Sequence, residues 1–435
     1  LPLQIRRGWT AFLNGQVKKA EAMLTDARQA LLSLPPTPEL RALRGELATY
    51  LANVLFLHED SATIIEMAEE ALVFLPPDQV VARARATGAL GLGVSLAGDT
   101  RRAMDLYHAT VELARSAGNP FFLAHALEVV VDGLYHTGQL HAAAETSREI
   151  IDLGASEGTT PLPFAGNGHI KLAGIYIEWQ ELEKAREHLE RGFALCRYGG
   201  IGYNSLQDHC TEVRLLHALG DDEGALAALR RAEGVFRAGR SRIMAVQLAA
   251  CEVQFWLNAD DVERAAAWAE GRPPIGKFIL NHELPDIGRE VQLVSLARVR
   301  LAQKRPDAVL SIYNQVCRQA QEAGRMARVI EISLLKALAL QALGESAAAL
   351  EPLQQCLALT QPEGYIRLFL EADASVVSLL RQARARSISI DYVNGLLDVF
   401  RTLEFHPTTA SQGLPEALTL REFEVLQLIA DGYSK

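Results

Sequence analysis

The sequence predicts an all-α protein, a right-handed superhelix (solenoid) of about nine helix pairs with a period near 41 residues. A short signature recurs along most of the 435 residues. Apolar residues follow the three- and four-residue spacing of helices, and almost no segment alternates as a strand would. Hydrophobic residues make up 49% of the chain and charged residues 22%, so a large core can form.

The recurring signature is a glycine or polar residue, four variable residues and then an alanine. It predicts the end of a first helix, a turn that needs a positive φ, and a second helix whose alanine allows close packing. The clear copies are Gly15–Ala20, Gly98–Ala103, Gly138–Ala143, Gln180–Ala185, Gly220–Ala225, Asp260–Ala265, Gln303–Ala308 and Gly344–Ala349. From Ala103 onward the alanines lie 40 to 43 residues apart, and a weaker copy at Leu57–Ala62 brings the total to nine.

The flanking segments supply the two helices of each pair. Second helices continue four and seven residues beyond the alanine, as in Ala20, Leu24 and Ala27. Upstream segments such as 84–96 and 329–343 have the same spacing and are expected to be first helices. The signature resembles the tetratricopeptide repeat (TPR), whose period is about 34. The longer period here fits longer helices and leaves armadillo- or HEAT-type pairs as an alternative.

Prolines are compatible with this assignment. Those that fall between units are Pro35, Pro36, Pro76 and Pro77. Pro306 suits the first turn of a helix, and Pro352 is expected to mark a kink. The repeats are assigned to residues 1–357 and one or two capping helices to residues 358–404. Residues 405–416 combine Pro, Gly, Ser and Thr and are predicted to be a linker.

Residues 417–435 predict a capped amphipathic helix. Thr419 is placed as the N-cap with Glu422 three residues later, before an apolar stripe that includes Phe423 and Leu426. The segment LTLREFEVLQLIADGYSK resembles the first part of a LuxR-type helix-turn-helix. The matching residues are Leu418, Thr419, Arg421, Glu422, Glu424, Val425, Leu426, Leu428, Ile429, Ala430, Gly432, Ser434 and Lys435.

The resemblance implies that residues 417–435 are the N-terminal part of a truncated DNA-binding domain. Its candidate DNA-binding residues are Thr419, Arg421, Glu422, Ser434 and Lys435. In the family the residues around the turn contact phosphate, which concerns Ser434 and Lys435. The recognition helix lies beyond them, so these residues alone are not expected to read bases.

Residues 363–373 (EGYIRLFLEAD) are similar to a segment that precedes the linker in the large ATP-binding LuxR regulators, the MalT-like group. There a signal-transduction (STAND) NTPase precedes a superhelix of similar repeats and a LuxR-type domain. The resemblance implies an effector-sensing region that couples an inducer or a regulatory protein to transcription activation. It also implies DNA, RNA polymerase and self-association as interactions of the complete protein. The alternative is a TPR-type scaffold that binds proteins and has no small-molecule ligand.

No GxxxxGK[ST] loop occurs, so no cofactor is assigned to this chain, and ATP is implied only for a preceding NTPase domain. Because the chain starts at Leu1 and ends at Lys435 within a motif, we expect it to be part of a longer polypeptide. The formal net charge of −10 disfavours nucleic acid along most of its length. The absence of a leader and of a long apolar run predicts a cytoplasmic protein without a membrane span.

Candidate ligand-binding residues gather near the middle of the stack. They are the aromatic and polar residues Tyr176, Trp179, Tyr203, Asn204, Gln207 and His209. Aromatic rings with amides and an imidazole suit a sugar or another small polar effector on the concave face. The alternative is that Tyr176 and Trp179 pack between helices.

The sequence indicates no disulfide framework, metal site or catalytic site. The five cysteines are scattered without CxxC spacing, and His, Asp and Glu have no metal-ligand spacing. Without a nucleophile elbow, we do not expect an enzyme. Glycines such as Gly88, Gly91 and Gly166 lack a nucleotide-binding pattern and are attributed to close helix packing.

Overall fold

The chain is helical throughout the part that the structure describes. The computed structural model describes residues 1–35, 37–56, 60–155, 161–197, 205–239, 241–269 and 286–405. These ranges contain twenty-one α-helices and no strand, which confirms the predicted fold class. Within the same ranges, no helix combines the length and hydropathy needed to cross a membrane.

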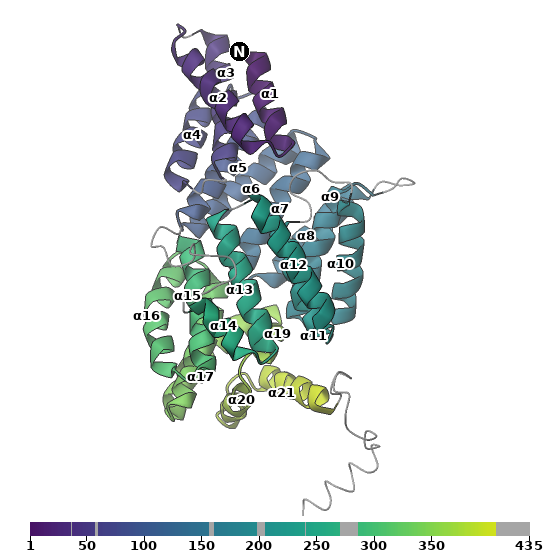
Figure 1. The fold of residues 1–435 in the computed structure, drawn as a ribbon, viewed down its shortest axis with the longest axis vertical. Coiled ribbons are helices and arrows are strands. Elements are labelled where there is room, and N and C mark those ends of the chain that lie inside the picture. The colour runs from purple at the N-terminus through teal and green to yellow at the C-terminus, as the bar shows by residue number, and fades with distance from the viewer. Residues whose placement is uncertain are drawn as a thin grey trace, which may run out of the picture.

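Nine helix pairs follow one another along the chain, as predicted (Figure 1). The first five pairs are α1 (Pro2–Leu13) with α2 (Val17–Leu32), α3 (Pro38–Leu55) with α4 (Ser61–Phe74), α5 (Val80–Leu96) with α6 (Thr100–Ser116), α7 (Pro120–His136) with α8 (Leu140–Gly154), and α9 (Phe164–Glu178) with α10 (Leu182–Cys196). The last four are α11 (Leu206–Ala218) with α12 (Asp222–Gly239), α13 (Arg242–Asn258) with α14 (Val262–Ala269), α15 (Asp286–Ala302) with α16 (Pro306–Glu322), and α17 (Met326–Ala342) with α18 (Ser346–Thr360).

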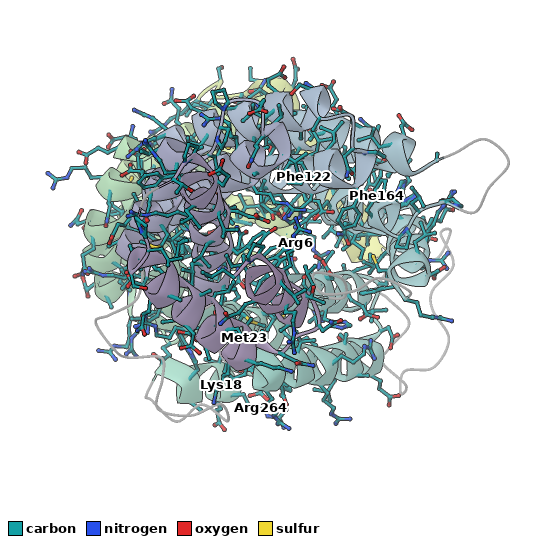
Figure 2. The ribbon with its side chains drawn as sticks, turned by 90° about the horizontal axis from the view of Figure 1, so that it is seen from above. Arg6, Lys18, Met23, Phe122, Phe164 and Arg264 are labelled. Atoms are coloured by element: carbon teal, nitrogen blue, oxygen red, sulfur yellow. The ribbon has the colours of Figure 1, made fainter. Side chains whose placement is uncertain are left out.

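First helices form the inner wall of the superhelix and second helices the outer wall. A first helix such as α17 buries residues on nearly every side, whereas a second helix such as α6 buries a single stripe. Neighbouring first helices contact each other, so the stack is narrower on their side. Viewed along the axis, Arg6 and Phe122 of first helices lie nearer the centre than Lys18 and Arg264 of second helices (Figure 2).

The turn between the two helices of a pair has the predicted left-handed residue. Glycine takes it at Gly15, Gly98, Gly138, Gly220 and Gly344, with φ between 76° and 91°. Gln180, Asp260 and Lys304 take it with φ between 58° and 60°. The residue five positions later is buried in each of these pairs, which explains why an alanine recurs there.

Two of the nine predicted signature copies are wrong in register. Lys304 has the positive φ, so Val309 is the buried residue at 0% exposure and Ala308 is only half-buried. In the second pair Asp60 caps α4 and Ile64 is the buried residue, whereas the predicted Ala62 is exposed. Neither turn offers a glycine to mark its register, and a nearby alanine was mistaken for the packing position.

Glycines within helices allow the close approach of neighbouring helices. A Cβ on Gly91 of α5 would stand 2.7 Å from Cε1 of Tyr107 in α6. A Cβ on Gly168 of α9 would stand 2.8 Å from the carbonyl oxygen of Ser147 in α8. At distances below 3.0 Å the neighbouring atoms would have to shift, so glycine at these positions favours the close packing.

Three helices follow the last pair instead of the expected one or two. α18 runs through Pro352 to Thr360, and a short 3-10 turn then leads to α19 (Arg367–Leu370), α20 (Val376–Ala385) and α21 (Ile390–Phe405). Leu379 and Leu380 of α20 are fully buried, so these helices cover the end of the apolar core. The linker after residue 405 and the helix-turn-helix segment lie outside the described residues.

The superhelix turns far enough for distant pairs to meet. The first helices α5, α7 and α9 contact α15, α17 and α19, respectively. α19 therefore continues the series of first helices, although it is only four residues long. We call this contact the inter-turn interface. It brings the segment Glu363–Glu371, here called the docking segment, against the middle of the repeat array.

Candidate functional site

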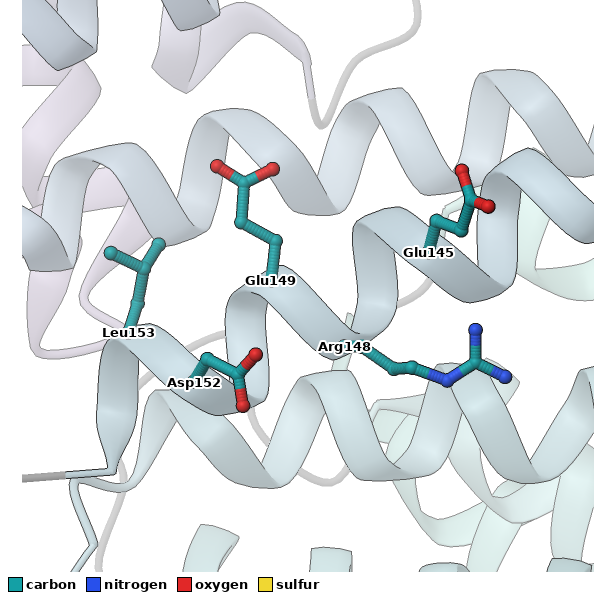
Figure 3. Close-up of a pocket in the computed structure, with 5 residues that line it drawn as sticks. All are labelled: Glu145, Arg148, Glu149, Asp152 and Leu153. Atoms are coloured by element: carbon teal, nitrogen blue, oxygen red, sulfur yellow. The ribbon is translucent and has the colours of Figure 1, made fainter.

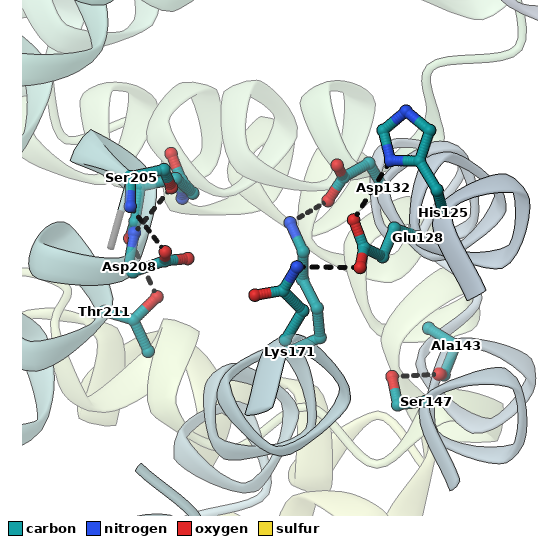
Figure 4. A network of polar contacts seen from close by, with 11 residues as sticks. His125, Glu128, Asp132, Ala143, Ser147, Lys171, Ser205, Asp208 and Thr211 are labelled. Atoms are coloured by element: carbon teal, nitrogen blue, oxygen red, sulfur yellow. Dashed lines mark hydrogen bonds and ion pairs between the residues drawn. The ribbon is translucent and has the colours of Figure 1, made fainter. Parts of the chain in front are cut away.

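The inner faces of α7, α9 and α11 carry a group of charged side chains (Figure 4). Lys171 of α9 donates to Asp132 of α7 at 2.5 Å, and Asn167 of α9 donates to Glu128 of α7 at 2.7 Å. Asp208 lies on the neighbouring α11. Residues three, four and seven positions apart share one side of a helix, so the repeat geometry places these polar groups on one inner surface.

Electrostatics in this group are dominated by carboxylates around one ammonium. Burial alone would lower the pKa of Lys171, but the negative charges of Asp132 and Asp208 outweigh it and raise the pKa. Burial raises the pKa of Asp208, and Lys171 opposes that effect. Lys171 pairs with Asp132, and the negative charges of Asp208 and Glu128 also act on it. Such a surface suits a ligand that presents hydroxyl or amine donors.

The predicted ligand-binding residues divide into two groups. Tyr176 and Trp179, at the C-terminal end of α9, lie edge to face with ring centroids 5.7 Å apart. His209 instead stacks on Phe193 at 5.4 Å and lies 3.2 Å from Glu212, while Gln207 is exposed. Tyr203 and Asn204 lie outside the described residues.

The side chain of Trp179 makes its contacts with other residues of the same chain. Its indole N–H donates a 2.8 Å hydrogen bond to the carbonyl oxygen of Glu363, and its ring contacts His141 with centroids 5.1 Å apart. Tyr176 contacts His188 at 5.3 Å. Both rings pack between helices, which was the alternative to an open aromatic platform.

The predicted DNA-binding residues Thr419, Arg421, Glu422, Ser434 and Lys435 all lie outside the described residues. Their roles stay predictions.

The inter-turn interface contains residues that sequence reasoning missed. At one end, Arg325 donates to the carbonyl oxygen of Gly98 in the turn between α5 and α6 and pairs with Glu290 at 2.5 Å. Both side chains of that pair are almost fully buried. The turn carbonyl of Gly98 thus receives a buried donor from the other turn of the superhelix.

The docking segment provides hydrogen bonds at two helix ends. The carboxylate of Glu363 accepts the backbone N–H of His141 at 3.0 Å, where α8 has no side-chain cap of its own. The backbone N–H of Ile366 donates to the carbonyl oxygen of Glu178 at 2.8 Å, at the end of α9. A carboxylate at a helix N-terminus and a donor at a helix C-terminus are both favourable.

Ion pairs complete this contact. Arg214 of α11 lies 2.9 Å from Glu178 and 3.5 Å from Glu371 of the docking segment. Tyr135 also donates to Glu178, at 2.6 Å. Burial would raise the pKa of Glu371, but the charges of Arg214 and Arg367 hold it below its ordinary value. The segment EGYIRLFLEAD carries a family resemblance, but its sequence alone does not show what it contacts.

A surface depression on the outer helix α8 lacks convergent groups. It has a volume of about 490 Å³ and is lined by Glu145, Arg148, Glu149, Asp152 and Leu153 (Figure 3). All five belong to the second helix α8. A specific pocket usually gathers polar groups from several elements, so this depression is a poor candidate.

Within the described ranges, no group of three or more His, Cys, Asp or Glu side chains could hold a metal ion. His169 and His188 face each other with Nδ1 atoms 2.8 Å apart. Burial and the nearby His188 lower the pKa of His169 to about 4. The five cysteines are free thiols.

A family model described as the MalT-like TPR region matches residues 45–386. The chain belongs to the MalT-like TPR family. Its matched region begins within α3 and ends directly after α20. The MalT-like TPR region therefore includes both sides of the inter-turn interface.

Solved helical-repeat structures are also similar to this MalT-like TPR protein. A Rap protein complexed with Competence and Sporulation Factor shares 13% identity over 92% of this chain and 98% of its own, with a TM-score of 0.48. The apo form of RapI shares 12% identity over 79% and 98%, with a TM-score of 0.41. The P58(IPK) TPR domain shares 12% over 88% and 98%, with a TM-score of 0.22. Similarities at these levels say nothing about what this chain binds.

Proposed function

We propose that this MalT-like TPR region is the effector-sensing part of a LuxR-type transcription regulator. The observation that carries the proposal is the docking segment. Its hydrogen bonds at the end of α9 connect a helix of the inner wall with the chain that leads to residues 417–435. A ligand on the inner wall is thereby placed to influence a C-terminal DNA-binding domain.

The chemistry of the inner wall supports a small polar effector. Glu128, Asp132 and Asp208 supply acceptors on two helices, and Lys171 supplies a donor between them. A sugar or an amine-bearing molecule matches this set because its hydroxyl or ammonium groups can replace the present internal partners. The proposed role is binding without catalysis. ATP, RNA polymerase and DNA are proposed as partners of other parts of the complete protein.

A thermal-shift screen with sugars, amines and short peptides tests the effector site. A true effector raises the unfolding temperature by mass action. The response should disappear in Asp132→Asn, which removes the carboxylate paired with Lys171. It should persist in Glu112→Gln, a matched change of an exposed carboxylate on the outer helix α6.

The scaffold alternative predicts a different result. No small molecule shifts the unfolding temperature, and a specific protein partner binds with an affinity that Asp132→Asn leaves unchanged. That outcome would contradict the effector-sensing proposal and support a role as a protein-binding scaffold.

The regulator assignment has a separate test in the reading frame that encodes this chain. We expect it to continue past Lys435 through a recognition helix and to encode a Walker-type NTPase upstream. A frame that encodes neither would refute the LuxR-type assignment and leave the inner-wall site to be judged by the binding screen.

A further inference from the structure

The inter-turn interface joins the same structural position in three consecutive pairs. The turns at Gly98, Gly138 and Gln180 each contact the C-terminal part of the chain. Gly98 accepts from Arg325, an added Cβ on Gly138 would stand 3.5 Å from the backbone nitrogen of Ala327, and Gln180 accepts from Arg367 at 3.4 Å. The interface is therefore a continuous line of contacts across the superhelix.

The two sides of the docking segment differ in chemistry. On one side Phe369 is buried against the C-terminal helices, where its ring meets that of Tyr392 of α21 at a centroid distance of 6.2 Å. Tyr392 also donates its hydroxyl to the carbonyl oxygen of Tyr365. The segment is thus anchored to α21 by apolar packing.

The other side, which faces α8, α9 and α11, is held by polar groups. They are the carboxylate and carbonyl of Glu363, the N–H of Ile366, and the side chains of Arg367 and Glu371. Such groups find replacement partners in water, so separating them costs less than exposing an apolar core.

The contact seen in the structure also leaves one buried hydroxyl, that of Tyr365, without a hydrogen-bond partner among the described residues. Burial raises its pKa, and the nearby carboxylate of Glu178 adds to that effect. A buried hydroxyl without a partner destabilises the state that contains it, and opening the interface would hydrate it.

We propose that the inter-turn interface is a reversible joint. In the closed state the docking segment is bonded to α8, α9 and α11. In the open state these polar contacts are hydrated, while the segment remains packed on α21. The joint does not depend on whether the chain regulates transcription.

Hydrogen exchange of the Ile366 amide tests the joint in the full chain, with fragmentation that resolves single amides. Arg214→Gln removes the positive charge that faces Glu371, and Trp179→Phe removes the donor to Glu363. Each should speed exchange at Ile366 by about tenfold, because each removes one cross-interface contact. Arg231→Gln, which breaks the 2.8 Å pair with Glu212 away from the interface, is the matched control.

The joint predicts a local effect. Amides inside α13 and α16 should keep their rates in both variants, and added salt should speed Ile366 in the unaltered chain because it screens the ion pairs. The proposal is overturned if Ile366 does not respond to either variant. It is equally overturned if Ile366 accelerates together with the amides of α9 and α17, since the segment would then open only when the fold does. Trp179→Phe alone carries the test if Arg214→Gln does not fold.

Discussion

The indole N–H of Trp179 donates a 2.8 Å hydrogen bond to the carbonyl oxygen of Glu363, which lies 184 residues further along the chain. A solenoid held only by contacts between neighbouring pairs would not bring these residues together. The bond belongs to the inter-turn interface, and its contribution to the free energy of unfolding can be measured.

Trp179→Phe should lower the free energy of unfolding by about 1 kcal/mol, because the Glu363 carbonyl loses its donor while most of the ring packing stays. Trp179→Ala should cost at least about 3 kcal/mol, because the ring is then lost as well. Urea unfolding measures both. A Trp179→Phe variant as stable as the unaltered chain would mean that the hydrogen bond contributes nothing.

Arg325→Met should destabilise the protein by about 3–5 kcal/mol, because it leaves the carboxylate of Glu290 buried without its partner. Adding Glu290→Gln to Arg325→Met should recover part of the loss, since the buried charge is then absent. Urea unfolding of the two single variants and the double variant gives the coupling. Additive losses would contradict a buried ion pair.

Glu252 should make stability depend on pH. Burial, with repulsion from Glu233, raises its pKa from 4.5 to about 7 in the folded chain. Below pH 4.5 the residue is protonated in both states. As the pH rises toward 7 the unfolded chain ionises first, so up to about 3 kcal/mol of stability is lost across this window. Glu252→Gln should flatten the profile and stabilise the protein at pH 8, as measured by urea unfolding at several pH values.

Gly166→Ala should be destabilising by at least about 1–3 kcal/mol. A Cβ there would stand 2.7 Å from the carbonyl oxygen of Gly192, a backbone atom that cannot move aside easily. Gly88→Ala is the control, because its Cβ would make an ordinary 3.4 Å contact with Thr110. That variant should be neutral or gain up to about 1 kcal/mol from helix propensity. Thermal unfolding of the pair decides whether packing explains these glycines.

The register of the eighth pair can be checked with adjacent substitutions. Val309 is fully buried five residues after Lys304, so Val309→Ala should cost about 2 kcal/mol. Ala308→Gln should change stability by less than about 0.5 kcal/mol, because Ala308 is only half-buried at the start of α16. A larger loss for Ala308→Gln would restore the register expected from the alanine pattern.

The repeat was predictable because its turn has a local chemical requirement. A positive φ favours glycine, and the position five residues later favours a small side chain. Where the turn residue is Lys304, no local signal marks it, and the register slipped by one. The two helices of a pair are neighbours in sequence, so the predicted pairing remains correct when the predicted register is wrong by one residue.

The inter-turn interface was not predictable from the same pattern. Which pairs meet depends on the small rotation between successive pairs, and that rotation accumulates from packing details that no short motif encodes. The candidate ligand residues show a related limit. The sequence left open whether Trp179 binds a ligand or packs between helices, and it did not indicate its hydrogen-bond partner, the carbonyl oxygen of Glu363.

Closure of the superhelix also affects how the protein folds. Solenoids whose units touch only their neighbours can fold from any point, one unit after another, and their stability is close to a sum over units. Here Glu178 and Ile366 meet through the backbone, so α9 reaches its full set of contacts only after the C-terminal helices have been synthesised. The middle of the array should therefore reach its final packing last during translation. A substitution that destabilises one side of the contact should also destabilise the helices on the other side.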